Sequence, residues 1–311
     1  MKRSIRYMAL MATAVTSAVF MLAVMPGNEM KAKASTGPFT VTGGTEGTDY
    51  SYESSVLTII KGTALTISST STSSDTIVVD SAVGADITLS GVDIDVSATS
   101  GKCAFDIDSD SSNVTITLED ANVLKSGKFC AGLQNKNSGN LTIKGNGSLT
   151  AVGGDSGAGI GGGYNKSGSD ITISGGNVTA TGAGGGAGIG GGSGESGSNI
   201  TISGGTVTAT GAAGGAGIGG GYNGSGSNIT ISGGTVTATG TSGGAGIGGG
   251  DQGTGSDIQI APAAGSIAAW EGADAGSAAL VRTVAAPDSY TYPGSTPVYI
   301  KTVSSVPDLC Y

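Results

Sequence analysis

The strongest constraint on the fold of this chain is an internal repeat of about 29 residues. The motifs ITIS and VTATG recur at that step, and so does AGIGGG, with its isoleucine at Ile160, Ile189, Ile218 and Ile247. Looser copies precede these at a slightly shorter step, such as Val114-Thr115-Ile116 and Leu141-Thr142-Ile143. A fixed period of this length is typical of a solenoid, because each repeat buries its apolar face only against its neighbours.

Within one repeat, apolar and polar residues alternate in three short segments, Ile200–Ser203, Thr206–Thr210 and Ala216–Gly219. A period of two is typical of strands with one buried face. The glycines between the segments permit the positive φ of tight corners. The sequence therefore predicts an all-β fold, a right-handed parallel β-helix of about eight coils, with three short strands in each coil of 27 to 29 residues.

The two ends of the chain differ from the repeats. Residues 1–34 contain basic residues, an apolar stretch and the site Ala32-Lys33-Ala34 in that order, which predicts a signal peptide and an exported protein. An uncleaved amino-terminal anchor is the alternative, because the apolar stretch approaches the length of a membrane span. We expect an amino-terminal cap over residues 35–55, the β-helix over residues 56–260, and a carboxyl-terminal cap or linker over residues 261–311. The abrupt end at Tyr311 favours a truncated chain.

The charge of the chain excludes some classes of partner. The formal net charge is −9, and removal of residues 1–34 would leave nine basic and 22 acidic residues, or −13. We expect no nucleic acid partner, because phosphate binding needs a basic surface. We also expect no transmembrane segment after cleavage of the signal peptide. Histidine is absent, so the commonest general base and metal ligand is missing.

Two of the cysteines share the repeat spacing. Cys103 and Cys130 are separated by one step of the looser copies, and each precedes an alanine. On adjacent coils their Cα atoms would lie about 5 Å apart, a distance that a disulfide accepts. Two reduced, buried thiols packed as small apolar residues fit the spacing equally well, so the sequence leaves both states open.

Several segments carry a resemblance to a known family: TIVVDSAVGADITLSGVDIDVSATSGKCAFDID at Thr76–Asp108, CAGL at Cys130–Leu133, and the glycine-rich copies that follow. Over about residues 50–265 the chain resembles the glycine-rich β-strand-repeat proteins of anaerobic bacteria, often labelled carbohydrate-binding-domain proteins. The resemblance implies a parallel β-helix that is secreted or displayed on the bacterial cell surface, with a polysaccharide or cell-wall glycan as its partner. The motifs are specific for the solenoid and only weakly specific for function.

Aspartates alternate with apolar residues in two segments of the early coils. Between residues 75 and 120 the chain has ten acidic residues against one lysine. If both segments are strands, their carboxylates share outward faces, and oxygen-rich clusters of this kind suit Ca²⁺. A solvated acidic surface screened by salt is the alternative. The candidate calcium ligands are Asp93, Asp95, Asp106, Asp108 and Asp110.

Tyr164 and Tyr222 occupy the same corner of the repeat, two repeats apart. On that spacing they predict two aromatic platforms about 10 Å apart, suitable for stacking on sugar rings. The alternative is that each tyrosine covers its own turn.

No residues single out a catalytic centre. Glycoside hydrolysis needs two carboxyl groups at a set separation, and nothing in the acidic segments selects such a pair. We therefore expect a protein without catalytic activity that binds extracellular polysaccharide, with Ca²⁺ at the acidic coils. The alternatives are a structural or adhesive surface stalk without a ligand site, and a polysaccharide lyase or hydrolase. The sequence leaves the oligomeric state open.

Overall fold

The computed structural model shows a fold made of β-strands. It describes residues 34–80, 84–108, 113–136, 139–260, 267–270 and 290–292. Within these ranges every regular element is a strand. The all-β class that the alternating pattern predicts is therefore confirmed.

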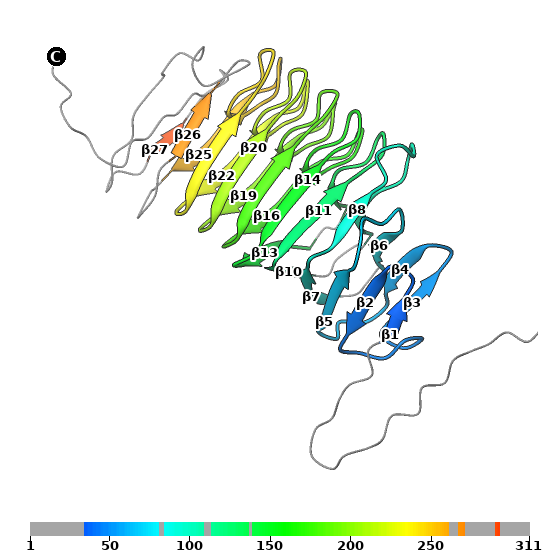
Figure 1. Cartoon of the computed structure of the whole chain (residues 1–311). Helices are drawn as coiled ribbons and strands as arrows, with labels where there is room; N and C mark the ends of the chain where they lie inside the picture. Colours follow the sequence, from blue (N-terminus) through cyan, green and yellow to red (C-terminus); the bar gives the residue numbers. More distant parts are fainter. Residues whose placement is uncertain are drawn as a thin grey trace, which may run out of the picture. The chain divides into compact units, whose positions relative to one another are not determined.

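Most of the strands stack in three parallel sheets (Figure 1). The first sheet contains β5 (Leu65–Ser69), β7 (Ala85–Ser90), β10 (Val114–Glu119), β13 (Leu141–Gly145), β16 (Gly168–Ile173), β19 (Gly197–Ile202), β22 (Gly226–Ile231) and β25 (Gly255–Ile260). The second contains β8 (Asp93–Asp95), β11 (Ala121–Lys125), β14 (Ser148–Val152), β17 (Asn177–Thr181), β20 (Thr206–Thr210), β23 (Thr235–Thr239) and β26 (Ile267–Trp270). The third contains β4 (Val56–Ile59), β6 (Thr76–Val79), β9 (Phe105–Ile107), β12 (Leu133–Asn135), β15 (Ile160–Gly161), β18 (Ile189–Gly190), β21 (Ile218–Gly219) and β24 (Ile247–Gly248).

The chain visits the three sheets in a fixed order. It passes from the third sheet to the first and then to the second, as in β6, β7 and β8, before it returns to the third sheet at β9. This path is that of a parallel β-helix, as predicted. Six turns between residues 76 and 239 contain all three strands, and β24, β25 and β26 form one further turn at the carboxyl-terminal end. The predicted count of about eight coils is a small overcount, because it also included the strands at both ends.

Residues one period apart pair directly across neighbouring coils. Ile160, Ile189, Ile218 and Ile247 are successive Cα partners in the third sheet, and all four are fully buried. In the second sheet the buried valines and alanines pair in the same way, whereas the threonines between them point outward. The interior is therefore a set of continuous apolar columns, with a step of about 4.8 Å between coils.

The regular coils after Tyr164, which we call the clean repeats, depend on glycine in their short third strand. A Cβ added at Gly188 would lie 2.5 Å from the backbone nitrogen of Thr210, and one added at Gly217 would lie 2.6 Å from the carbonyl oxygen of Gly246. Neighbouring backbones approach so closely here that no side chain fits between them. This close approach explains why AGIG recurs without variation in the clean repeats.

The first-sheet strands begin earlier than the alternation predicts. β19 starts at Gly197 rather than at Ile200 because Gly197 and Ser198 also pair with the coil before, while Asn199, with φ of 53°, is left out of the register. The amide of Asn199 donates to the Asp170 carboxylate (2.9 Å), and the amide of Asn228 donates to Asn199 (2.6 Å). These residues thus form a polar ladder along the outside of the first sheet.

Antiparallel strands lie at the edges of the parallel sheets. β2 (Phe39–Thr42) pairs with β5, β1 (Ala34–Thr36) pairs with β2, and β3 (Tyr50–Glu53) pairs with β4. At the other end of the first sheet, β27 (Tyr290–Tyr292) pairs with β25. These strands satisfy backbone groups that a parallel stack leaves unpaired at its edges.

Two predicted segments lie mostly outside the described residues. The expected signal peptide covers residues 1–34, of which only Ala34 is described, and of residues 261–311 only β26 and β27 are described. In the described ranges, no helix has the length and apolar character needed to cross a bilayer.

Candidate functional site

The chain makes the same tight turn in five successive passages from the second sheet to the third, beginning with the passage from β11 to β12. Equivalent residues of this turn adopt a positive φ: Phe129 (76°), Ser156 (74°), Gly185 (98°), Gly214 (94°) and Gly243 (94°). The turn that follows a third-sheet strand packs beside the positive-φ turn of the coil before. For example, the backbone N–H of Tyr164 donates to the carbonyl of Phe129 (2.9 Å). Side chains from two columns of turns therefore meet at this corner.

Phe129 is the bulkiest residue of the positive-φ column. A side chain in this backbone conformation costs about 1–3 kcal/mol, and large residues rarely adopt it. The clean repeats avoid the cost with glycine, which has no Cβ. Phe129 is 42% exposed, so burial of the ring offsets only part of the strain. Strained conformations of this kind cluster at functional sites, which makes Phe129 the first candidate for a binding role.

The Phe129 ring lies beside a second exposed aromatic ring. Its centroid is 5.5 Å from that of Tyr164, with a tilt of 39° between the planes, and Tyr164 is 46% exposed. The Lys128 ammonium lies 5.0 Å from the Phe129 centroid and 2.9 Å from the Asp155 carboxylate. We name this group of four residues, Lys128, Phe129, Asp155 and Tyr164, the aromatic corner. The aromatic corner thus has an exposed apolar surface, and at its edge lies an ion pair whose two charges balance.

Tyr222 does not repeat the environment of Tyr164. A Cβ added at Gly214 would lie 2.7 Å from Cδ2 of Tyr222, and one added at Gly185 would lie 3.1 Å from its Cβ. The Tyr222 side chain thus rests on the glycine turns of two coils, in the place where Tyr164 meets Phe129. The two tyrosines share a column, as predicted, but only Tyr164 is part of a pair of exposed rings.

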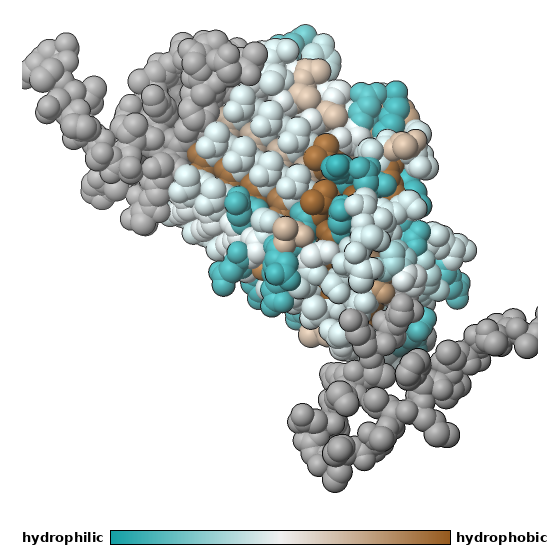
Figure 2. All heavy atoms as spheres, viewed as in Figure 1, coloured by the Kyte–Doolittle hydropathy of each residue, from teal (hydrophilic) through white to brown (hydrophobic). Residues whose placement is uncertain are grey.

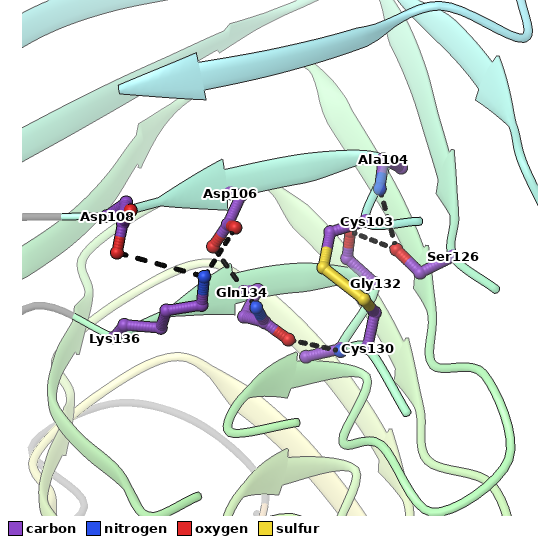
Figure 3. The surroundings of a disulfide bond; sticks show 10 residues. Cys103, Ala104, Asp106, Asp108, Ser126, Cys130, Gly132, Gln134 and Lys136 are labelled. Carbon is purple, nitrogen blue, oxygen red and sulfur yellow. Dashed lines mark hydrogen bonds and ion pairs between the residues drawn. A yellow bond between two sulfur atoms is a disulfide. The ribbon is translucent and has the colours of Figure 1, made fainter. Parts of the chain in front are cut away.

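A disulfide holds the strained turn (Figure 3). It joins Cys103 to Cys130, the residue after Phe129, with Cα atoms 5.3 Å apart. Beside it, the Ser126 hydroxyl accepts a hydrogen bond from the backbone of Ala104 (2.8 Å) and donates to the carbonyl of Gly132 (3.4 Å). The covalent bond and these hydrogen bonds fix two stacked turns to each other, and with them the backbone that carries the Phe129 ring.

The structure distributes the candidate calcium ligands over two sheets. Asp93 and Asp95 lie on β8 in the second sheet, whereas Asp106 is on β9 in the third sheet and Asp108 follows it. The Lys136 ammonium lies 2.7 Å from the Asp106 carboxylate and 3.8 Å from that of Asp108 (Figure 3). Asp110 lies outside the described residues. The chain turns a corner between the two segments, so their carboxylates do not form one cluster.

Asp95 also has its own protein partners. The Ser97 hydroxyl (2.6 Å) and backbone N–H (3.1 Å) donate to its carboxylate, and Lys125 lies 3.3 Å away. The hydrogen bonds from Ser97, followed by Lys125, lower the pKa of Asp95 below its usual value. In the described part of the chain, no three histidine, cysteine, aspartate or glutamate side chains gather as a metal site. Calcium binding stays a prediction.

The aromatic corner is suited to recognition of a ring-shaped ligand. Aromatic faces pack on flat apolar groups, and the Tyr164 hydroxyl, Lys128 and Asp155 provide donors and acceptors at the rim. The disulfide and the close coil stacking hold this arrangement before a ligand arrives, which lowers the entropic cost of binding.

Sequence reasoning missed three of the four residues of the aromatic corner. Phe129 lies in KFCAGL, which aligns with GGGAGI, AGGAGI and SGGAGI of the clean repeats, so a phenylalanine stands where those copies have glycine. That substitution at a glycine position was the available signal. The partnership of Lys128 with Asp155 was hidden because the two residues are a full coil apart in the sequence, and only coil stacking brings them together.

Comparison with known proteins supports the fold. A family model described as a β-helix repeat matches residues 141–164, 171–193, 200–222 and 229–251. Each matched segment runs from a first-sheet strand through the second sheet to the turn after a third-sheet strand, and the first of them ends at Tyr164. No curated protein and no solved structure matches the chain.

Proposed function

We propose that this protein is a secreted or cell-surface β-helix protein that binds polysaccharide without catalysis, and that the aromatic corner is its binding site. The observation that carries the proposal is the strained and exposed Phe129 ring, paired with the exposed Tyr164 ring. A fold built from repeats has many positions for glycine, and this position keeps a costly phenylalanine instead.

Several features of the corner support a sugar as the ligand. Pyranose rings present flat C–H faces that pack on aromatic rings, while their hydroxyls need hydrogen-bond partners around the rim. Lys128 and Asp155 neutralise each other, so the corner has no excess charge to select an ionic ligand. These properties favour a neutral glycan.

The second candidate function is a structural or adhesive stalk, favoured by the regular outer surface of the clean repeats. Threonines pair with threonines along the second sheet, in the columns Thr179-Thr208-Thr237 and Thr181-Thr210-Thr239. A stalk has no need of an exposed aromatic pair at a strained turn. The aromatic corner is the reason to place glycan binding first.

A glycan array with the mature protein tests the proposal, followed by calorimetry on the glycans that bind. We expect Phe129→Ala and Tyr164→Ala to weaken binding at least tenfold. Tyr222→Ala, which changes an aromatic residue of the same column outside the pair, should leave short glycans bound as before. Absence of binding to every glycan on the array, with and without calcium, would leave the stalk as the better proposal.

A further inference from the structure

A second surface feature lies on the coils of the aromatic corner, at the passage from the first sheet to the second. A shallow, open hollow of about 610 Å³ lies there. Its polar lining includes Glu119, Asp120, Asn146, Ser148 and Asn177. We name it the polar hollow.

The polar hollow arises where the length of the corner changes. Ile143 pairs with Ile173, and Ser148 pairs with Asn177, so the connection has one residue more in the earlier coil than in the later one. The coil before it has the longer connection too, from Ile116 to Ala121. The two longer corners lie next to the shorter corners of the clean repeats, and the hollow lies where the length of the connection changes.

A buried asparagine makes the wall of the hollow rigid. The Asn122 side chain is 1% exposed, and its amide donates to the carbonyls of Glu119 (2.8 Å) and Ser148 (3.1 Å). Its side-chain oxygen accepts the backbone N–H of Val92 (2.9 Å). The Asp120 carboxylate is held by the Ser90 hydroxyl (2.7 Å). The backbone around Glu119 and Ser148 and the Asp120 carboxylate are therefore positioned before any ligand binds.

The two longer corners lead into the strands that end at the aromatic corner. Asp120 precedes β11, which runs toward Lys128 and Phe129, and Asn146 precedes β14, which runs toward Asp155. A five-residue strand is about 17 Å long. The polar hollow and the aromatic corner thus lie at opposite edges of the second sheet on the same coils, separated by the outer faces of β11 and β14.

We propose that the polar hollow is a second sugar subsite, and that one polysaccharide chain lies along β11 and β14 from the hollow to the aromatic corner. This inference rests on the proposed function of the aromatic corner. The path over a sheet is flat and extended, which favours a ribbon-like β-1,4-linked chain over a coiled one. Glu119 and Asp120 repel acidic sugars, and the carboxylates and amides of the hollow pair with sugar hydroxyls. The ligand class is a neutral, extended polysaccharide.

Calorimetry on fragments of different length tests this inference. The probes are disaccharides and hexasaccharides of β-1,4-linked glucose, xylose and mannose, with hexasaccharides of α-1,4-linked glucose and of galacturonate for comparison. We expect at least one β-1,4-linked hexasaccharide to bind about tenfold more tightly than its disaccharide. The coiled and the acidic hexasaccharides should bind no more tightly than that disaccharide.

Variants of the hollow locate the extra affinity. The double variant Glu119→Gln with Asn146→Ala should lower the affinity for the hexasaccharide about fivefold and leave the affinity for the disaccharide unchanged. Phe129→Ala should lower the affinity for both fragments. Circular dichroism confirms that each variant keeps its strands, and the disaccharide serves as an internal control for folding.

Four outcomes would overturn the inference. Equal affinity for the two fragment lengths, or hollow variants that bind hexasaccharide like the wild type, would restrict binding to the aromatic corner and leave the proposed function intact. Loss of hexasaccharide affinity in Tyr222→Ala but not in the hollow variants would place the chain along the axis of the stack. Failure of the wild type to bind any of these fragments would remove this inference, whereas the glycan array decides the proposed function separately.

Discussion

The early coils, up to Tyr164, and the clean repeats that follow share one interior but have different surfaces. Interior columns of isoleucine, valine, leucine and alanine run through both regions. The outside differs. The early coils contain the four ion pairs found between described residues, and they also contain the disulfide and both strongly exposed aromatic residues, Phe129 and Tyr164. Figure 2 shows a mostly pale surface over the clean repeats, crossed by a thin brown line, and larger patches of brown and teal toward the amino-terminal coils. The comparison indicates that coil stacking specifies the fold, and that the residues of the proposed binding site lie where the repeat departs from its own pattern.

The substitutions with the largest expected effect test whether the interior is packed alike in the two regions. Ile218→Ala in a clean repeat and Leu133→Ala in an early coil each remove a fully buried side chain. We expect each to lower the free energy of unfolding by about 4 kcal/mol, because a truncated side chain leaves a cavity in a close-packed core. Urea unfolding followed by circular dichroism measures the loss. A loss below about 1 kcal/mol in only one region would show that the columns are not packed alike.

The disulfide is found only in the early coils among the described residues, and its removal has the next largest expected effect. Cys103→Ala with Cys130→Ala opens a covalent loop of 27 residues, which we expect to lower the free energy of unfolding by about 3 kcal/mol. Alanine fits here because it keeps the Cβ that each cysteine already has and removes only the sulfur. Thermal unfolding with and without reductant checks the value. The double variant should be insensitive to reductant, and a reductant-dependent shift in the variant would assign the effect to another group.

Phe129→Gly separates function from stability at the aromatic corner. Glycine adopts a φ of 76° without strain, so the free energy of unfolding should stay unchanged or rise by about 1 kcal/mol. Glycan affinity should fall at least tenfold because the ring is lost. Calorimetry and thermal unfolding of the same preparation measure both quantities. Reduced stability with unchanged affinity would make Phe129 a structural residue.

The features that follow from periodicity were predictable from the sequence, and those that break it were not. The column of Ile160, Ile189, Ile218 and Ile247 follows directly from the constant step of the repeat, because equal spacing stacks equal residues. The aromatic corner and the polar hollow depend on a single unusual residue or on one extra residue in a connection. Their geometry comes from contacts between coils of different length, which the alternation within one coil does not encode.

The smallest expected effect concerns Asp95, a charged residue at a position that is threonine in the clean repeats. Its pKa is lowered in the folded protein by Ser97 and then by Lys125, so the folded state binds fewer protons than the unfolded state in the acidic range. Stability should therefore fall as the pH drops below about 4, where the unfolded carboxyl is protonated first. Asp95→Asn should be slightly less stable at neutral pH, by less than about 1 kcal/mol for a partly exposed pair, and should show a shallower loss between about pH 4 and pH 2. Thermal unfolding across this range measures the slopes, with Asp251→Asn as the control, since Asp251 is an acidic residue of a clean repeat. Equal slopes for Asp95→Asn and the wild type would show that acid sensitivity arises from other carboxyl groups.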